Sequence, residues 1–328
     1  MSELIKKLKE AQSKTLHEKE LELKAHSTNV KYDSYLTKKV QQEKASRLDL
    51  KNVPGDYFEK LSAQYAASQV EYKNYLPFIT NQLSKLVPLY YPNLILVGAL
   101  TGSGKTTASA NIVHRLLKEK KKVLILSNEE LVLDIYTRLA CLDLDLNIND
   151  RLCFTDEQHN LIKLKIPEIG EYVRVVDLEY DNNKELTSSV EGMRAIFQHL
   201  EKEKIFDCII IDYYQKVSKS DNYQKNANHQ VLQDFTDVLD RYYKTCHAPV
   251  VVMCQLHPTR TEDTSFESRI KLGKSILISS TLAIEIESDK AKLETIWTCH
   301  KGRWGNQGAK VITKWSKGKF TDSEGSNE

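Results

Sequence analysis

The chain lacks a long apolar run, and its charges nearly cancel. No stretch of its 328 residues approaches the length of a membrane span, and charged residues stand where a secretory signal would be apolar. We therefore expect a cytoplasmic protein that does not enter a membrane. The 47 basic and 45 acidic residues leave a net charge of +2, too little to draw the whole chain to nucleic acid. Any nucleic-acid contact must be local.

Cysteine motifs are also missing. The six cysteines include no Cys-x-x-Cys pair, and Cys208, Cys254 and Cys299 lie in or at the end of apolar, strand-like runs. This pattern favours buried, reduced thiols over a zinc site or disulfides. The 41% hydrophobic content is enough for a core, and the length allows one large domain of about 230 residues plus a smaller part.

Glycine and proline are absent from residues 1–53, which are rich in Lys, Glu, Gln and Leu. This composition favours helix, and further helices are expected over 56–72 and 76–86. We divide the chain into a helical arm (1–90), a main domain (91–320) and a polar tail (321–328). A solvated or partly disordered arm and a partner-binding helix are both compatible with the first 53 residues.

From residue 94 onward, short β-branched or Leu-rich runs alternate with longer helical patterns. The alternation predicts an α/β fold whose mainly parallel sheet is flanked by helices. The expected strands are 94–97, 123–126, 172–176, 208–211 and 250–254, and the expected helices are 106–118, 131–142, 186–203 and 229–245. Three later runs, 282–286, 295–299 and 310–315, have short connectors without helices, so we expect antiparallel strands that extend the sheet.

A glycine-rich segment, Ala-Leu-Thr-Gly-Ser-Gly-Lys-Thr over residues 99–106, joins the first strand to the first helix of the sheet. Gly102 and Gly104 leave room for backbone N–H groups to face a phosphate chain, and the following helix N-terminus adds a favourable field. Lys105 is expected to reach the outer phosphates and Thr106 to hold Mg²⁺. The segment therefore predicts a P-loop that binds a nucleoside triphosphate.

The P-loop departs from the usual pattern at its first position. A glycine normally stands there, whereas this chain has Ala99, with Gly98 one residue earlier. We treat this as a tolerated variant, because the strand and helix context argues against a glycine-rich turn that binds nothing. The predicted nucleotide-binding residues of this segment are Ala99, Thr101, Gly102, Ser103, Gly104, Lys105, Thr106 and Thr107.

Carboxylates follow two other predicted strands. Asp212 ends the run Asp-Cys-Ile-Ile-Ile-Asp about 100 residues after the P-loop, where such proteins place a carboxylate beside Mg²⁺. Glu129 and Glu130 follow the strand 123–126, at the sheet edge where ligands bind. We choose Glu129 as the general base that orients an attacking water, and leave Glu130 open as the alternative. Both glutamates could instead merely stabilise the start of the next helix.

Taken in order, these motifs resemble the RecA-type motor domain of the DnaB-type replicative DNA helicases. The resemblance covers about residues 94–320 and includes the P-loop with alanine at its first position. The other elements are Leu-Ser-Asn-Glu-Glu (126–130), Ile-Asp-Tyr-Tyr-Gln (211–215), Cys-Gln-Leu (254–256) and Lys-Gly-Arg-Trp-Gly (301–305). It implies a RecA-like ATPase with ATP and Mg²⁺ as cofactors.

The resemblance also assigns roles. Glu129 would polarise water, and Gln255 would sense the γ-phosphate and couple it to DNA-binding loops. Lys301 and Arg303 would reach into the ATP site of the neighbouring subunit, with Arg303 as the arginine finger. Such a finger contributes on the order of 10³ to 10⁵ in rate, so assembly would gate hydrolysis. The implied protein is a homo-oligomer, expected to be a hexameric ring, that moves along single-stranded DNA and unwinds duplexes.

Two polar segments, 216–228 and 258–274, follow the predicted sheet edge and are candidates for gripping single-stranded DNA. Lysines and arginines spaced along loops suit contacts with phosphates, and binding through them should weaken steeply with salt. An ordinary solvated surface is the alternative. The candidate contact residues are Lys216, Lys219, Lys225, Arg260, Arg269 and Lys271.

The amino-terminal arm departs from the family. Its members usually carry a sizeable helical domain that contacts primase, so we expect a phage-type member without that domain and leave a loader or primase partner open. Two other functions also stay open: a recombinase or accessory ATPase that binds DNA without separating strands, and a regulatory ATPase switch. The sequence does not indicate the polarity of movement or the preferred nucleotide, and RNA stays open as an alternative track.

Overall fold

The computed structural model describes residues 75–178, 188–217, 228–258, 265–270, 274–303 and 305–323, together with residues 59, 62 and 63. Contacts within the chain divide it into two units, Met1–Gln69 and Val70–Glu328. Nearly all described residues belong to the second unit. Most of the predicted helical arm lies outside the described residues, so that part of the domain division stays a prediction.

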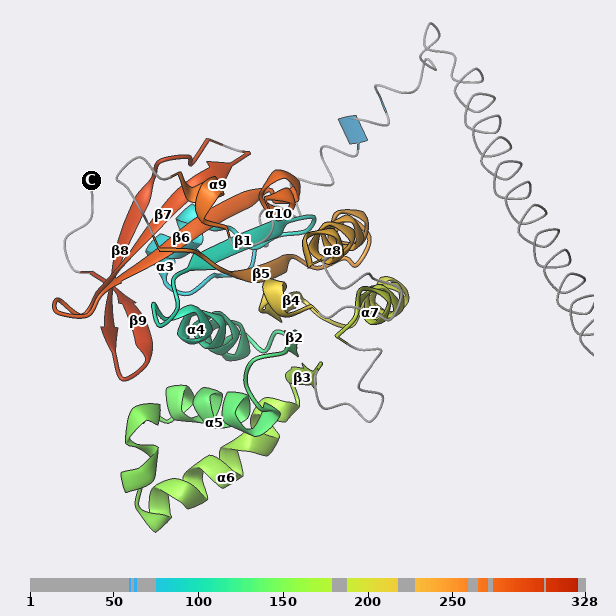
Figure 1. Cartoon of the computed structure of the whole chain (residues 1–328). Helices are drawn as coiled ribbons and strands as arrows, with labels where there is room; N and C mark the ends of the chain where they lie inside the picture. The colour runs from blue at the N-terminus through green and yellow to red at the C-terminus, as the bar shows by residue number, and fades with distance from the viewer. Residues whose placement is uncertain are drawn as a thin grey trace, which may run out of the picture. The chain divides into compact units, whose positions relative to one another are not determined.

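The described residues of the second unit form a nine-stranded sheet in the order β3-β2-β4-β5-β1-β6-β7-β8-β9 (Figure 1). From β3 to β6 along this order, neighbours pair in parallel, and β6 to β9 pair antiparallel. The predicted mainly parallel sheet with antiparallel C-terminal strands is confirmed. The strands are β1 (Leu94–Ala99), β2 (Val123–Ser127), β3 (Val173–Asp177), β4 (Cys208–Asp212), β5 (Val250–Gln255), β6 (Leu282–Asp289), β7 (Glu294–Gly302), β8 (Lys310–Ser316) and β9 (Lys319–Asp322).

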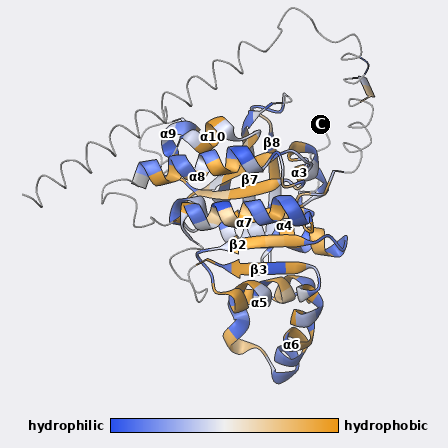
Figure 2. Ribbon diagram, turned by 90° about the vertical axis from the view of Figure 1, so that its right-hand side faces the viewer, coloured by the Kyte–Doolittle hydropathy of each residue, from blue (hydrophilic) through white to orange (hydrophobic). Residues whose placement is uncertain are grey.

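Helices cover both faces of the sheet because its central strands are apolar on both sides. On β1, Ile95 and Val97 pack into one core and Leu94 and Leu96 into the other. Figure 2 shows β2 as a continuous apolar strand beside helices of mixed hydropathy. The first core contains residues of α3 (Asn81–Leu86), α4 (Lys105–Lys118), α5 (Val132–Asp143) and α6 (Asp156–Gly170), and the second of α7 (Val190–Glu203), α8 (Asn228–Tyr242), α9 (Phe266–Arg269) and α10 (Ser275–Ser279). None of these helices is both long and apolar enough to cross a bilayer.

Three helices were not predicted: the short helices α9 and α10, and the longer helix α6. Of these, α6 is the longest. It begins with a capping box, in which Thr155 Oγ1 accepts a hydrogen bond from Gln158 N and Gln158 Oε1 accepts one from Thr155 N. Only Ile162 and Ile169 are buried, and Pro167 lies inside the helix, so the apolar period is weak. Two short 3₁₀ turns, η1 (Ile148–Cys153) and η2 (Tyr214–Lys216), complete the connections.

The predicted polar tail begins too early, because residues 321 and 322 belong to β9. The buried Phe320 ring packs edge-on against Trp297, with ring centroids 5.3 Å apart. Asn111 of α4 donates to Gly318 O and accepts from Phe320 N, which fastens the β8–β9 turn to the helix that follows the P-loop. A short alternation within a polar sequence was too weak a pattern to predict this strand.

Candidate nucleotide site

The P-loop connects the carboxyl end of β1 to the start of α4. Gly102 and Gly104 have φ values of +75° and +88°, a left-handed backbone that residues with a side chain rarely adopt. Gly104 directly precedes α4, whose first N–H groups have no partner within the helix. The loop is therefore built to offer backbone donors to an anion.

The Lys105 ammonium lies between a carboxylate and an aromatic ring. Its Nζ is 2.9 Å from Glu129 Oε2 and 3.7 Å from the centroid of the Tyr213 ring. Glu130 Oε1 instead pairs with Arg138 Nη2 at 2.6 Å. Of the two glutamates left open by the sequence, Glu129 is the one that meets the P-loop lysine.

Asp212 ends β4 as a buried carboxylate. Its exposure is 4%, and its Oδ1 accepts no hydrogen bond from the described residues. Burial raises its pKa to about 7; the Lys105 charge opposes this shift, whereas Glu129 and Glu130 add to it. An unpartnered, buried carboxylate oxygen beside the P-loop fits a divalent cation, because Mg²⁺ takes oxygen ligands.

The described residues offer no group of three His, Cys, Asp or Glu side chains that could hold a metal. A Mg²⁺ ion at this site would thus depend on phosphate oxygens in addition to Asp212 and the hydroxyl of Thr106, in the manner usual for nucleotide-bound Mg²⁺.

A cleft of about 280 Å³ opens over the P-loop. Gln255, at the end of β5, closes one side and donates a hydrogen bond to Thr101 Oγ1. Two predicted residues differ from the rest: Ala99 is fully buried within β1, and Ser103 is not part of the lining. The cleft is lined by Leu100, Thr101, Gly102, Gly104, Lys105, Thr106, Thr107, Glu129 and Gln255.

Asn128, which sequence reasoning included only as part of the Leu-Ser-Asn-Glu-Glu element (126–130), links β2 to β4. Its N–H donates to Asp212 O at 3.0 Å, and its Oδ1 accepts from Tyr213 N at 2.8 Å. Lys216 Nζ donates to Asn128 O at 2.8 Å, so this predicted nucleic-acid residue is bound to the edge of the nucleotide site. The sequence pattern that could have predicted the contact between Asn128 and residues 212 and 213 is a polar residue directly after an apolar strand.

Gln215 makes a matching contact with β5. Its Oε1 accepts from Gln255 N at 3.0 Å, and its Nε2 donates to Gln255 O at 2.9 Å. The side chain thereby holds both polar groups of the Gln255 backbone, and sequence reasoning did not assign it a role. The carboxyl ends of β2, β4 and β5 are thus linked by side chains of Asn128 and Gln215.

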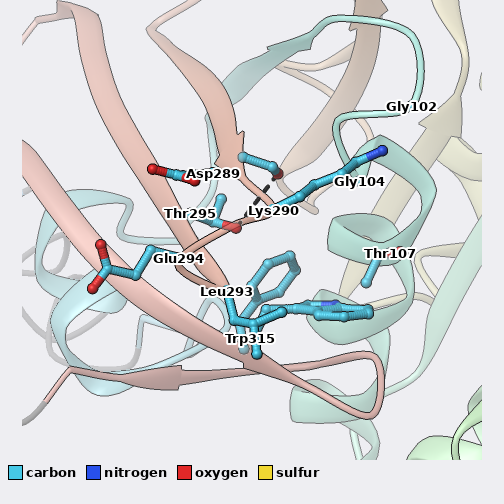
Figure 3. A pocket seen from close by; sticks show the side chains of 11 residues that line it. Gly102, Gly104, Thr107, Asp289, Lys290, Leu293, Glu294, Thr295 and Trp315 are labelled. Atoms are coloured by element: carbon cyan, nitrogen blue, oxygen red, sulfur yellow. Dashed lines mark hydrogen bonds between the residues drawn. The ribbon is translucent and has the colours of Figure 1, made fainter.

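A second cavity, of about 420 Å³, lies beside the P-loop and is bounded by the C-terminal strands (Figure 3). Ser288 Oγ donates to Ser103 O at 2.8 Å and so attaches β6 to the P-loop. Figure 3 shows Trp315 and Leu293 on the side of the cavity near Thr107. Sequence reasoning missed this wall, because β8 was predicted only as an extension of the sheet.

Lys301, near the end of β7, and Arg303, directly after it, lie at the edge of the sheet opposite the P-loop. Ile286 of β6 pairs with Ala99, whereas Leu282 pairs with both Ile95 and Gly302. The four steps along β6 from Leu282 to Ile286 span about 13 Å at about 3.3 Å per residue. The structure therefore does not bring Arg303 together with the P-loop of its own chain.

The two basic side chains differ in their surroundings. Lys301 Nζ donates to Leu277 O at 2.6 Å and Ile278 O at 2.7 Å, at the end of α10. Burial and, secondarily, the charge of Arg303 lower the pKa of Lys301. Arg303 is exposed. A role for Lys301 in another chain's site would require its ammonium to leave these carbonyls.

The predicted nucleic-acid residues are only partly described. Lys219, Lys225, Arg260 and Lys271 lie outside the described residues. Arg269 is corrected: its side chain is 7% exposed and its Nη1 is 2.6 Å from Glu285 Oε1. A buried, paired guanidinium cannot reach a nucleic-acid phosphate, and its position in α9 instead serves the structure.

The family model described as the DnaB-like helicase C terminal domain matches residues 76–269, more than half of the chain. Two curated relatives, the ATPase ASNA1 homologs of Plasmodium yoelii yoelii and Plasmodium chabaudi chabaudi, are 28% and 26% identical over 133 residues. These matches cover 36% of this chain, which spans about a third (35%) of each relative's length.

Solved structures share the fold. The ATPase domain of a DnaB-like helicase superposes with a TM-score of 0.67 at 16% identity, covering 83% of this chain and all (100%) of that one. A second such protein, a DnaB-like replicative helicase described with its interactions with primase, gives 0.65 at 15% identity, covering 88% and 71%. The RadB recombinase gives 0.50 at 15% identity, covering 76% and 100%. At these identities the likeness bears on the fold alone, and the predicted RecA-like fold is confirmed.

Proposed function

The chain belongs to the family of the DnaB-like helicase C terminal domain, and from that membership we propose that it is an ATP-driven DNA helicase. In this proposal, identical copies form a six-membered ring, bind ATP and Mg²⁺ where two copies meet, and translocate on single-stranded DNA. Opening a duplex costs about 1.4 kcal/mol per base-pair step, so unwinding has to be coupled to hydrolysis.

One observation carries the proposal: the phosphate site and its candidate finger lie at opposite edges of one sheet. Lys105 and Gln255 stand at the carboxyl edge, whereas Arg303 is exposed beyond β7 at the other edge. From that edge, the Arg303 guanidinium could contact a triphosphate only in the P-loop of another copy of the chain. Repeated head to tail, such a contact closes into a ring or continues as a filament.

The side chains at the cleft suggest how hydrolysis proceeds. Phosphate oxygens compete with Glu129 for the Lys105 ammonium, because both are anionic and Lys105 already holds the carboxylate at 2.9 Å. The released Glu129 then orients a water towards the γ-phosphate as general base. Mg²⁺, when bound with ATP, neutralises charge on the phosphate oxygens, and Thr106 and Asp212 would hold it. Gln255, joined to Thr101 beside the cleft, responds to the γ-phosphate.

The cavity in Figure 3 suits the base of the nucleotide. It adjoins the P-loop glycines and presents the half-buried Trp315 together with Leu293 and Phe320. An aromatic side chain stacks on any base, since every base has a π-face. Asp289 and Glu294 add acceptors at the rim, and we expect ATP as the nucleotide.

Single-stranded DNA is the proposed track. Lys219, Lys225, Arg260 and Lys271 remain the proposed phosphate contacts, with Lys216 beside the nucleotide site, and Arg269 is removed from the set. The interaction with primase described for the DnaB-like replicative helicase structure belongs to that protein. For this chain, a loader or primase partner is left open. We propose a cytoplasmic location, where a DNA helicase would act.

Strand displacement tests the proposal directly. A labelled forked duplex is incubated with ATP and Mg²⁺, and wild type is compared with Lys105→Ala and Arg303→Ala. Lys118→Ala, an exposed lysine at the end of α4, is the matched control. We expect unwinding by wild type and the control alone. Full unwinding by either site variant contradicts the assignments, and ATP-dependent DNA binding without strand separation would favour a recombinase or accessory ATPase.

A further inference from the structure

A buried carboxylate on β6 joins two elements that the proposed function uses separately. Glu285 is 4% exposed; its Oε1 lies 2.6 Å from Arg269 Nη1, and its Oε2 lies 2.9 Å from His300 Nε2. The contact with Arg269 is held by charge, since Oε1 accepts no aligned hydrogen bond from the described residues. Each of the two buried charges needs the other, because an isolated charge in the interior is strongly unfavourable.

The Arg269 side of the cluster belongs to the segment that follows β5. Arg269 ends α9, and its Nε donates to His257 O at 3.3 Å. Phe266, at the start of α9, lies over Gly98 of β1, where an added Cβ would come within 2.9 Å of the ring. This close approach gives Gly98 a packing role. The middle of the proposed DNA-contact segment is thus fixed to the strand that leads into the P-loop.

The His300 side belongs to the strand that carries the candidate finger. Ala283 pairs with Lys301 and Ile284 with Cys299, so His300 is the extra residue of a β-bulge. The bulge lets two consecutive side chains of β7 meet the same layer of helices. His300 stacks on Phe266 with ring centroids 4.4 Å apart at 4°, and Lys301 donates to carbonyls of α10.

We propose that Glu285 is a positioning residue that links the DNA-contact segment after β5 to Arg303. The path runs from Arg269 through the carboxylate to His300 on β7, and Arg303 follows three residues later, directly after the end of that strand. In this proposal, nucleic acid that binds the segment 258–274 shifts α9. Because α9 contacts His300, the bulge of β7 shifts with it. This inference rests on the proposed function, because it takes Arg303 as the group that completes a neighbouring ATP site.

A purely structural role makes a different prediction. If Glu285 served only to stabilise the fold, loss of its contacts with Arg269 and His300 would lower ATP turnover by the same factor with and without DNA. A positioning role lowers the DNA-stimulated rate selectively, because two sites that communicate share a coupling free energy beyond their separate binding energies. The ratio of stimulated to basal turnover therefore separates the two roles.

The test uses variants of the whole chain that split the cluster into its contacts. Glu285→Gln removes the charge at nearly constant shape. His300→Phe keeps the stack on Phe266 and loses the contact with Glu285, whereas His300→Gln keeps a donor and loses the stack. Because the His300 side chain is 31% exposed, we expect its two variants to fold, and they test the proposal even if Glu285→Gln does not fold. The exposed His199 of α7 supplies the control, His199→Gln.

ATP turnover is measured with and without a saturating single-stranded oligonucleotide, and the oligonucleotide Kd is measured in parallel. We expect the stimulation ratio to fall by about fivefold or more in Glu285→Gln and His300→Phe, with basal turnover and Kd unchanged. His300→Gln should lie between these variants and wild type. Wild-type stimulation in folded variants overturns the inference alone. A wild-type protein that hydrolyses ATP without any response to DNA overturns the proposed function and the inference with it.

Discussion

The parallel and antiparallel halves of the sheet place their polar side chains differently. In β2 and β4 the buried strand residues are apolar until the last position, where Ser127 ends β2 and Asp212 ends β4, and β1 has no polar side chain before the P-loop. In the antiparallel half, polar side chains are buried within the strands: Glu285 in β6, Thr295 in β7 and Thr313 in β8. The first half concentrates chemistry at one edge, and the second carries contacts through its interior.

The cause is the covering of the strands. A parallel strand with helices on both faces has no solvent-exposed face, so its functional groups lie at its ends. A buried carboxylate such as Glu285 is tolerated in the other half because Arg269 and His300 accompany it. Trp297 Nε1 likewise donates to Thr313 Oγ1 at 2.8 Å. We therefore assign nucleotide binding to the parallel half and the link between Arg269 and His300 to the antiparallel half, and we make four predictions from this difference.

The largest effect is expected from Arg303→Ala, at the far end of the antiparallel half. We expect ATP turnover of the assembled protein to fall by about 10³ to 10⁵, the usual contribution of an arginine finger, with ATP affinity retained. Steady-state turnover and nucleotide titration measure the two quantities. Arg303→Lys, which keeps the charge, should recover only part of the rate. Turnover near wild type in Arg303→Ala would remove the antiparallel half from the chemistry.

At the carboxyl edge of the parallel half, Glu129→Gln should lower turnover by about 10² to 10⁴, the range for loss of a general base. Glu130→Gln is the matched control, since its carboxylate pairs with Arg138 instead of meeting the P-loop lysine. Single-turnover hydrolysis separates chemistry from release. A larger loss in Glu130→Gln than in Glu129→Gln would exchange the roles of the two glutamates.

The core behind the P-loop predicts a pH-dependent stability. Burial, the largest cause, lowers the pKa of His114 on α4 from 6.5 to about 4. Between these values the unfolded chain binds more protons, so stability falls as pH drops from 6.5 towards 4. We expect a loss of about 2 kcal/mol between pH 7 and pH 5, measured by urea unfolding. His114→Gln should remove that loss and His199→Gln should keep it; equal slopes in all three proteins would contradict the assignment.

The smallest effect is expected at Trp315 of β8, which lines the cavity beside the P-loop. Trp315→Ala should weaken ATP binding about tenfold, within the range of about 1–3 kcal/mol found for stacking on a base. Turnover at saturating ATP should stay unchanged, because the side chain is proposed to hold the base alone. Trp315→Phe keeps an aromatic face and serves as control in nucleotide titrations. An unchanged affinity in Trp315→Ala would place the base elsewhere.

Sequence predicted the parallel half well because its strands are nearly uninterrupted apolar runs. The five predicted runs match β1 to β5 within one or two residues, and the P-loop and Asp212 stand where the pattern put them. The positions of these residues follow from local chemistry: glycines before a helix and a carboxylate after a strand. Their predicted roles are a separate matter and stay with the proposal.

The remaining features depend on partners distant in sequence. The burial of Arg269 follows from Glu285, and nothing near residue 269 indicates that pairing. The bulge at His300 shows only in the pairing of β6 with β7. Trp315 lines the cavity beside the P-loop because the turn between β8 and β9 is bound to α4. The sequence pattern of a strand does not indicate which helix the strand will contact.

Mixing two inactive variants tests the central claim, that one ATP site needs two copies of the chain. Lys105→Ala lacks a working P-loop but keeps its finger, and Arg303→Ala has the reverse defect. When the two are assembled together at equal concentration, about a quarter of the contacts between copies join an intact P-loop to an intact Arg303. We predict that ATP turnover returns in the mixture to about that fraction of wild type. Turnover that stays at the level of the separate variants would contradict a shared site.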